Sequence, residues 1–364
     1  MDNQKLSSFY KNKKILVTGH TGFKGSWLTM LLKYLGAEVA GYSLEPATTP
    51  SLFRVLGLNG NVKNYFSDIR DFETVKSVFE KEKPEIVFHL AAQPLVRDSY
   101  DDPLYTFQTN ILGTANILEA IRLSEQTKTA VMVTTDKVYE NKESSAAYKE
   151  GDELGGHDPY STSKACAEFV VRCYNRSFFQ DRTVYRQPKS FVASARSGNV
   201  IGGGDWSKDR LVPDIVRAVY ERQEKVLLRN PASIRPWQFV LEPLLGYLLL
   251  ARKLFHKEAS FIGAWNFSPE SGNFIQVEEM TKRAFILLGK GEYAIKEDKS
   301  KYETSVLKLD SQRAKKELGC KAVLSLHETL SWTFQWYKDF YLSKDMGELT
   351  KEQIKAFLTK AGYG

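Results

Sequence analysis

The segment Thr134–Lys137 reads Thr-Thr-Asp-Lys and follows directly on the apolar run Val131–Val133. A hydroxyl, a carboxylate and an amine side by side can offer one substrate a hydrogen bond, a proton donor and a proton acceptor. In isolation, a polar loop after a buried strand has the same composition. The other motifs of the chain decide between these two interpretations.

Tyr160 and Lys164 stand four residues apart in "DPYSTSK", at the start of a helical pattern. Residues at this spacing share one face of a helix. A tyrosine accepts a proton near neutral pH only if its pKa, normally about 10, is lowered. A neighbouring ammonium lowers it, so we expect Lys164 to make Tyr160 a base. The alternative is a surface tyrosine beside a surface lysine.

Gly19, Gly22 and Gly25 lie between an apolar strand and a helix in "ILVTGHTGFKGSW". Backbone N–H groups and the helix dipole at such a turn attract a pyrophosphate, and the missing side chains permit close approach. The loop therefore predicts a dinucleotide site. His20 is bulkier than such a loop requires, and we expect it to point to solvent; the alternative is that it loosens the binding of the cofactor.

The end of the second strand bears on which dinucleotide binds. An acidic residue usually stands there to bind the ribose. Ser43 occupies the place, and Glu45 follows two residues later. The nearest arginine that could bind a 2′-phosphate, Arg54, lies several residues further on. These residues favour NAD over NADP.

Short apolar runs alternate with helical patterns through the first half of the chain. This alternation predicts an α/β fold, a Rossmann-like, doubly wound parallel sheet with helices on both faces. Strands are expected at residues 13–19, 37–44, 85–92 and 129–135, and helices at 26–36, 71–84 and 102–124.

The second half has a different texture from about Arg196, with clustered glycines and more aromatic residues. We predict a cofactor-binding domain over residues 1–195 with a returning segment near 236–256. Residues 196–364 would form mainly a smaller, interleaved C-terminal substrate-binding lobe. Residues 237–255 read as a strand plus a helix of the sheet. Residues 349–364 read as a final helix with Thr350 and Gln353 in capping-box register.

The 364 residues carry a net charge of +7, with basic residues scattered along the chain. This distribution does not suggest a nucleic-acid partner, and it suits a small anionic substrate. Cys166, Cys173 and Cys320 form no CxxC pair, and the five histidines show no ligand spacing. We therefore expect no disulfide, no metal and a reducing compartment. Without a signal peptide or about 18 consecutive apolar residues, a soluble cytoplasmic protein is expected.

The segments "TGHTGFKG", "HLAAQP", "TTDKVYE" and "YSTSK", in this order, resemble the extended short-chain dehydrogenase/reductase superfamily. The segments "TGHTGFKGSWL", "YSLEPATTPSLF", "ARSGNVIGGGDW" and "RNPASIRPWQFVLEPLLGYL" are similar, more narrowly, to the CDP-glucose 4,6-dehydratase family. The resemblance covers roughly residues 10 to 340. The chain departs from the family's pattern at Ser43 and in "QDRTVYRQPKSFVAS", where basic residues precede an expected strand.

The resemblance implies an NAD-dependent lyase that converts CDP-D-glucose to CDP-4-keto-6-deoxy-D-glucose and water. The sugar would be oxidised at C4, lose water across C5 and C6, and receive the hydride at C6. Such products enter deoxysugar pathways of surface polysaccharides, including the O-antigen of lipopolysaccharide. The base of the nucleotide rests on the resemblance alone.

The resemblance also implies the catalytic roles. Tyr160 with Lys164 would take the C4 hydroxyl proton, and Thr135 would hydrogen-bond the same oxygen. Asp136 would be the acid at the C6 hydroxyl, which requires burial to raise its pKa. Lys137 would be the base at C5. The alternative for Lys137 is a salt bridge to Asp136 or Glu140.

The remaining assignments concern binding. The cofactor would contact the glycine loop, the ends of the next strands and the tyrosine–lysine pair, namely Gly19, Thr21, Gly22, Phe23, Lys24, Gly25, Ser43, Asp68, Ile69, Leu90, Ala91, Ala92, Gln93, Thr109, Tyr160 and Lys164. The sugar nucleotide would contact Asn199, Arg210, Leu211 and Arg235. Roles for Arg229 and Arg196 stay open. The resemblance implies a homodimer through two helices per subunit, one of which would carry Phe169, Val170 and Tyr174 outward. A helix face buried in the protein's own core would show the same residues.

Two other functions remain possible at this level. An NAD-dependent nucleotide-sugar epimerase or reductase would use the glycine loop and the tyrosine–lysine pair but leave Asp136 and Lys137 without a role. A non-catalytic dinucleotide sensor would leave Thr135, Tyr160 and Lys164 without one.

Overall fold

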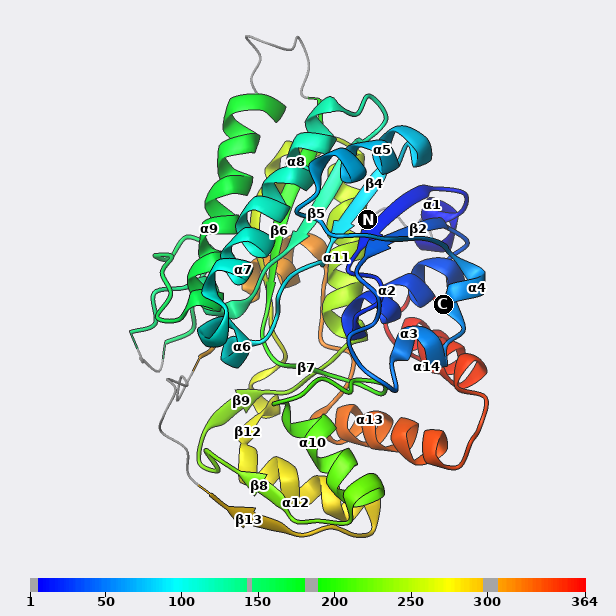
Figure 1. Ribbon diagram of the computed structural model, residues 1–364, viewed down its shortest axis with the longest axis vertical. Helices are drawn as coiled ribbons and strands as arrows, with labels where there is room; N and C mark the ends of the chain where they lie inside the picture. Colours follow the sequence, from blue (N-terminus) through cyan, green and yellow to red (C-terminus); the bar gives the residue numbers. More distant parts are fainter. Residues whose placement is uncertain (1–5, 143–145, 181–188, 297–306) are drawn as a thin grey trace.

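The computed structural model describes residues 6–142, 146–180, 189–296 and 307–364. Within these residues, seven parallel strands form one sheet in the order β11-β6-β5-β4-β1-β2-β3, which confirms the Rossmann-like α/β prediction (Figure 1). The strand order reverses beside β1, and ligands bind at such a point in open α/β sheets. The strands are β1 Lys14–Thr18, β2 Glu38–Ser43, β3 Lys63–Phe66, β4 Ile86–His89, β5 Thr129–Val133, β6 Phe191–Ser197 and β11 Gly263–Phe267.

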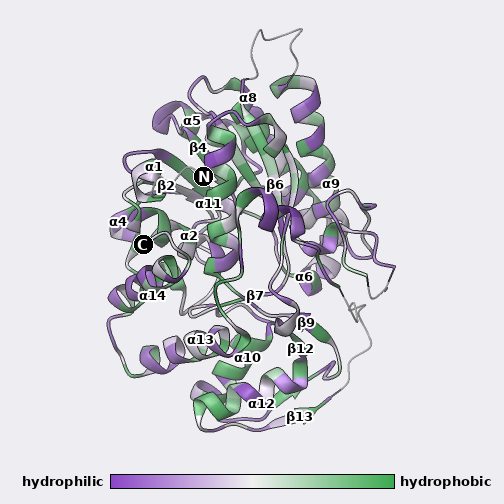
Figure 2. Ribbon diagram, turned by 180° about the vertical axis from the view of Figure 1, so that it is seen from behind, coloured by the Kyte–Doolittle hydropathy of each residue, from purple (hydrophilic) through white to green (hydrophobic). Residues whose placement is uncertain are grey.

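Helices cover both faces of the sheet, because successive side chains of a strand point to opposite sides. In β1, Ile15 and Val17 join one apolar core and Leu16 joins the other. The first core includes α2 (Phe23–Tyr34) and α11 (Leu241–Phe255). The second includes α5 (Phe72–Glu82), α8 (Gly113–Leu123) and α9 (Pro159–Tyr174). Figure 2 shows hydrophobic residues gathered on the strands and α11, and hydrophilic residues mainly on the outer helices and the loops.

A smaller group of elements lies beyond the carboxyl ends of the strands, at the bottom of Figure 1. It contains α10 (Leu211–Arg217), α12 (Val277–Leu288) and three short two-stranded ladders. The ladders are β8 (Val226–Leu228) with β13 (Tyr293–Ile295), β9 (Ile234–Pro236) with β12 (Phe274–Gln276), and β7 (Val200–Ile201) with β10 (Gln238–Phe239). The helix α13 (Leu326–Tyr341) packs on α12, and α14 (Met346–Lys360) packs on α13 and α2.

Shorter helical elements complete the described residues. They are α1 Leu6–Tyr10, α3 Leu52–Val55, α4 Leu58–Asn61, α6 Val96–Asp101, α7 Pro103–Phe107, the 3-10 turns η2 Asp136–Val138, η5 Ala259–Phe261 and η6 Ser271–Asn273, and the π turns η1 Gln108–Leu112, η3 Asn175–Phe179, η4 Ala218–Arg222 and η7 Ala314–Leu318. The helix expected over 102–124 is therefore α7 and α8 joined by a π turn. No helix in the part of the chain that the structure describes is long and apolar enough to cross a membrane.

Two local predictions differ from the structure, and two strands lacked a prediction. In residues 237–255 the helix is present, but the strand β10 pairs with β7 outside the main sheet. The capping box at Thr350 and Gln353 is wrong, because α14 begins earlier and its N-cap is Asp345, which accepts from the Glu348 N–H. Thr350 is instead buried and accepts a hydrogen bond from the Trp336 ring. The strands β3 and β11 were not predicted.

The structure describes only part of the segment "QDRTVYRQPKSFVAS", in which a strand was expected after the basic residues. Residues 181–188 lie outside the described residues, and the strand β6 begins at Phe191.

Candidate active site

One cleft of about 1080 Å³ opens at the carboxyl ends of the strands, between the sheet and the smaller group of elements. Loops after β1 to β6 line one side of it, and residues of β7 to β9 and α10 line the other. Every residue that the sequence assigned to the cofactor, the substrate or the chemistry lines this cleft. Tertiary structure thus brings the predicted residues together, although their roles stay predictions.

The three glycines of the first loop have different reasons to be glycine. Gly19 has a φ of +72°, and a Cβ there would lie 2.6 Å from the Ala91 nitrogen. A Cβ on Gly25 would lie 2.0 Å from the Gly19 carbonyl oxygen. A Cβ on Gly22, the N-cap of α2, would meet only that oxygen, at an ordinary 3.4 Å. The chain itself does not require a glycine at position 22, and the bare backbone there suits a pyrophosphate.

His20 corrects one prediction, because its side chain points inward and is wholly buried. Its Nε2 lies 2.9 Å from the Asn64 side-chain oxygen. The ring occupies space that Gly41 of β2 leaves, where a Cβ would lie 2.2 Å from the His20 Cδ2. Burial lowers the pKa of His20 to about 4. The space at Gly41 comes from a strand some twenty residues away, so the loop sequence alone did not reveal it.

The end of β2 carries hydroxyl groups in place of the usual carboxylate. The Ser43 hydroxyl lies 2.8 Å from that of Thr21, which donates to the Leu44 carbonyl. Arg54 lies 3.7 Å from Glu45, and both side chains are exposed. The nearest arginine therefore already has an acidic partner, which is consistent with the expected preference for NAD.

Lys24, in the first turn of α2, also lines the cleft. Its ammonium donates to the Ser197 hydroxyl at 2.9 Å and lies 3.4 Å from the Tyr247 hydroxyl. Desolvation, and next the charge of Arg210, lower its pKa to about 7, while Asp136 opposes this shift.

The Thr-Thr-Asp-Lys segment begins immediately after β5 and forms the turn η2. Thr135 donates to an Asp136 oxygen at 3.0 Å. Asp136 is only 6% exposed, and burial raises its pKa, as an acid role requires, despite the opposing charge of Lys137. A Cβ on Gly198 would lie 2.7 Å from an Asp136 oxygen, so β6 and the residue after it close over this carboxyl.

Lys137 is half-buried and lines the cleft. Within residues 6–142, 146–180, 189–296 and 307–364, the structure shows no ion pair of Lys137 with Asp136 or Glu140. Glu140 lies instead 3.3 Å from His157. The simple salt bridge is therefore not supported among these residues, and the role of Lys137 as a base stays a prediction.

Tyr160 and Lys164 lie in the first two turns of α9, as predicted, because Asp158 caps the helix and Pro159 begins it. The Lys164 ammonium donates to the Val133 carbonyl at 3.0 Å. Burial lowers its pKa to about 8, and the charge of Glu168 opposes this.

The expected lowering of the Tyr160 pKa is not met in this structure. Desolvation raises that pKa to about 12, and the Asp136 charge adds to the effect. Of its neighbours, Thr135 lowers the pKa through a hydrogen bond and Arg210 through its charge. Burial therefore outweighs the Thr135 hydrogen bond and the Arg210 charge in setting the pKa of Tyr160.

Charged residues at the opposite wall were largely missed. Asp209, with a φ of +58°, lies 2.6 Å from Arg229 of the β8–β9 loop and 4.0 Å from Arg97 of α6. Asp205 lies 2.9 Å from Arg210. The alternating charges of "DWSKDR" are the one local signal for these pairs. Arg229, left open above, thus lines the cleft, as Arg235 does, whereas Arg196 does not line it.

Comparison with known proteins shows the family of the chain. The family model described as GDP-mannose 4,6 dehydratase matches residues 16–333. A curated CDP-glucose 4,6-dehydratase of Salmonella typhimurium is 43% identical over 353 residues, which are 97% of this chain and 98% of that protein. A dTDP-D-glucose 4,6-dehydratase of Dictyostelium discoideum is 28% identical over 66% of this chain and 56% of its own.

Solved structures show the same fold. The UDP-glucose 4-epimerase of Thermotoga maritima, solved with UDP-glucose, has a TM-score of 0.77 at 23% identity, covering 90% of this chain and 99% of its own. The dTDP-glucose 4,6-dehydratase of Streptomyces venezuelae, solved with NAD, has a TM-score of 0.74 at 22% identity, covering 89% of this chain and 97% of its own. The family match spans most of the chain, so the protein belongs to the GDP-mannose 4,6 dehydratase family.

Proposed function

We propose that this protein is an NAD-dependent CDP-glucose 4,6-dehydratase that converts CDP-D-glucose to CDP-4-keto-6-deoxy-D-glucose and water. The relative of that name is 43% identical over nearly the whole of both chains. The observation that carries the proposal is the place of Asp136 and Lys137 in the same cleft as Thr135, Tyr160 and Lys164. An epimerase needs no second acid–base pair there.

The residues that line the cleft fit NAD. Gly22 leaves the helix N-terminus bare, and the Thr109 hydroxyl is a buried group of the cleft without a hydrogen-bond partner in the structure. NAD, when bound, supplies the hydride acceptor for C4 and the donor for C6. Gly19 to Gly25 would bind its pyrophosphate, Ser43, Asp68 and Ile69 the adenosine end, and Leu90 to Gln93 with Thr109 the nicotinamide end.

The oxidation step needs a base at the C4 hydroxyl. Tyr160 would take this proton, and Thr135 would hold the same oxygen by a hydrogen bond. The Lys164 ammonium would stabilise the phenolate form of the tyrosine by its positive charge. Since the Tyr160 pKa is about 12 in this structure, the tyrosine needs positive charge close by to serve as a base near neutral pH.

The elimination step needs a base at C5 and an acid at the C6 oxygen. The ketone at C4 makes the C5 proton acidic, and Lys137 would remove it. Asp136 would give its proton to the departing C6 hydroxyl, which leaves as water. The raised pKa of Asp136 supports this assignment, because a buried carboxyl keeps its proton closer to neutral pH.

The far wall of the cleft would hold the nucleotide. Arg235 and Arg210 would offer guanidinium groups to a diphosphate, and Asn199 and Leu211 line the same cleft. Arg229 is a further cation at this wall. We assign cofactor binding to residues 1–195 with the segment 236–256, and sugar-nucleotide binding mainly to the lobe within 196–364.

The test is mass spectrometry of CDP-glucose incubated with the purified protein, with NAD, with NADP and without either. Loss of one water without net consumption of NAD supports the proposal. Loss of water only from dTDP- or GDP-sugars keeps the reaction and overturns the substrate. A product of unchanged mass that differs from CDP-glucose, and that gives no near-ultraviolet absorbance of an enolised ketone in alkali, would instead indicate an epimerase.

We also propose a cytoplasmic homodimer that serves deoxysugar synthesis for surface polysaccharides. Phe169 of α9 is 49% exposed, and Leu104 and Leu112 near α7 are more exposed still. Val170 and Tyr174 are partly buried against the protein's own core, so Phe169 is the main outward apolar residue of that set. Light scattering of the wild type and of Phe169→Glu tests the dimer.

A further inference from the structure

A buried ion pair, Glu168 with Arg196, lies behind the cleft and has no part in the mechanism above. Glu168 follows Lys164 by four residues, on the same face of α9 as Tyr160 and Lys164. Glu168 is 5% exposed and Arg196, in β6, is 1% exposed. Removing two charges from water is costly, and apolar pairs of similar volume often stabilise a fold as well. A purely structural role therefore leaves the choice of charged residues unexplained.

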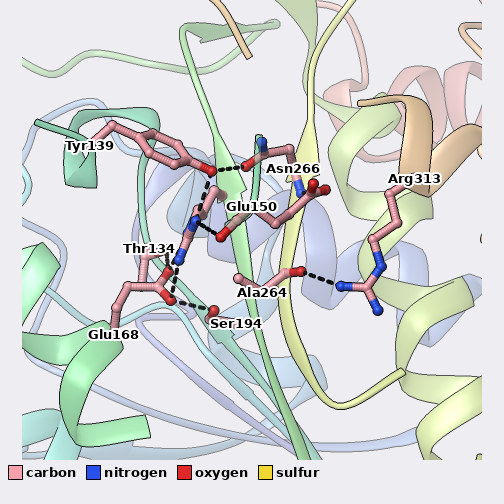
Figure 3. Close-up of polar contacts among 9 residues, drawn as sticks. Thr134, Tyr139, Glu150, Glu168, Ser194, Ala264, Asn266 and Arg313 are labelled. Atoms are coloured by element: carbon pink, nitrogen blue, oxygen red, sulfur yellow. Dashed lines mark hydrogen bonds and ion pairs between the residues drawn. The ribbon is translucent and has the colours of Figure 1, made fainter. Parts of the chain in front are cut away.

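The Glu168 carboxylate accepts four hydrogen bonds, arranged in matching pairs (Figure 3). One oxygen accepts from Arg196 Nε at 2.9 Å and from the Thr134 hydroxyl at 2.6 Å. The other accepts from Arg196 Nη2 at 2.9 Å and from the Ser194 hydroxyl at 2.6 Å. Of the two hydroxyl residues, only Thr134 belongs to the segment that continues into Thr135, Asp136 and Lys137.

The other end of the same segment is tied to Arg196. Arg196 Nη1 donates to the Tyr139 hydroxyl at 2.7 Å, and its guanidinium lies 4.9 Å from the centre of the Tyr139 ring. Tyr139 in turn donates to the Asn266 side chain of β11 at 2.8 Å. The turn that carries Asp136 and Lys137 is therefore held at Thr134 and at Tyr139 by the two members of one ion pair.

The helix that carries Tyr160 and Lys164 also carries Glu168, so the pair connects the two groups of proposed catalytic residues. We propose that Glu168 and Arg196 are positioning residues that hold Thr135, Asp136 and Lys137 in register with Tyr160 and Lys164. This inference rests on the proposed function. Geometry of this kind matters to rate, since a displacement of about 1 Å can cost about 100-fold.

The test compares Thr134→Val with Ser194→Ala. Each variant removes one hydroxyl that donates to Glu168 at the same distance. Replacing Glu168 itself would leave Arg196 buried without its partner and could unfold the protein, so the hydroxyl variants are preferred. Thr134→Ser, which keeps the hydroxyl, is the rescue variant.

We expect Thr134→Val to lower kcat about 10-fold or more with little change in KM, because binding residues are unaffected. Ser194→Ala and Thr134→Ser should stay within about threefold of the wild type. Equal losses of kcat in Thr134→Val and Ser194→Ala, in step with equal losses of melting temperature, would show a structural role and overturn the inference.

Backbone hydrogen exchange of residues 134–139 is the second readout and needs no substrate. Faster exchange there in Thr134→Val, but not in Ser194→Ala, supports positioning even if the wild type fails to dehydrate CDP-glucose. Unchanged exchange in both variants overturns it. A wild type that is inactive on every nucleotide sugar overturns the proposed function separately.

Discussion

The ammonium of Lys164 lies 3.0 Å from the carbonyl oxygen of Val133, the last residue of β5. One hydrogen bond thus joins the helix that carries Tyr160 to the strand that ends in the Thr-Thr-Asp-Lys segment. Two motifs that are far apart in the sequence meet at this contact, and the proposed chemistry requires that they meet.

Tyr160→Phe should abolish the first chemical step, because it removes the only group proposed to accept the C4 proton. We expect kcat for water loss to fall about 100-fold to 10,000-fold, the usual contribution of a positioned acid or base. Mass spectrometry of product formation measures this. Tyr34→Phe, at a 43% exposed surface tyrosine, is the control and should keep wild-type activity. An active Tyr160→Phe variant would contradict the assignment.

Lys137→Met and Asp136→Asn should separate the two halves of the elimination. Without the base, neither water loss nor exchange of the C5 hydrogen with solvent deuterium is expected. Without the acid, water loss should fall about 100-fold or more while C5 exchange persists. Deuterium incorporation measured by mass spectrometry distinguishes them. If Lys137→Met still exchanges at C5, another group is the base.

Gly22→Ala and Gly25→Ala should fail for different reasons. A methyl group on Gly22 meets nothing closer than 3.4 Å within the chain, so the protein should fold with a near wild-type melting temperature. Its affinity for NAD should fall about 10-fold or more, since the methyl group occupies the approach to the helix N-terminus. Calorimetric titration with NAD measures this loss. Unchanged affinity would remove Gly22 from the cofactor site.

Gly25→Ala should instead lower the melting temperature, because its methyl group would lie 2.0 Å from the Gly19 carbonyl oxygen. Thermal unfolding without cofactor distinguishes this effect from a loss of binding.

Stability should fall as the solution is acidified below pH 6.5. Burial lowers the pKa of His89 to about 3 and that of His20 to about 4, from 6.5. Below pH 6.5 each of these histidines therefore binds its proton in the unfolded chain but not in the folded one, which lowers the free energy of unfolding. Glu242, whose pKa burial raises to about 7, opposes part of this effect, because it binds its proton in the folded chain. At about 1.4 kcal/mol per pH unit, each histidine accounts for about 2 kcal/mol between pH 6.5 and 5.

Urea unfolding at several pH values measures this slope. His89→Gln should make the slope smaller by about 1.4 kcal/mol per pH unit, since it removes one of the two buried histidine ionisations. His327→Gln, at an exposed position, should leave it unchanged. A slope that is the same in all three proteins would mean that other groups cause the acid dependence.

Part of this protein could be predicted from short-range patterns. The alternation of apolar runs with amphipathic segments predicts the parallel sheet, because burial on two faces requires that pattern. The glycine spacing, the Thr-Thr-Asp-Lys segment and the Tyr160–Lys164 pair lie at the carboxyl ends of strands or at a helix start. In a parallel sheet these ends meet at one edge, so residues distant in the chain converge on one cleft.

Tertiary structure decided the features that depend on what packs against a residue. The His20 ring lies inward because Gly41 of β2 leaves space for it. The strand β10 pairs with β7 because the fold brings these two segments, which are distant in the sequence, side by side. The Tyr160 pKa rises because burial desolvates the phenol, which outweighs the Thr135 hydrogen bond and the Arg210 charge. The role of Arg196 stayed open and Glu168 was not singled out, because only the fold buries the two side chains together. Local sequence encodes the backbone's periodicity, whereas desolvation and charge pairing depend on distant parts of the chain that folding brings into contact.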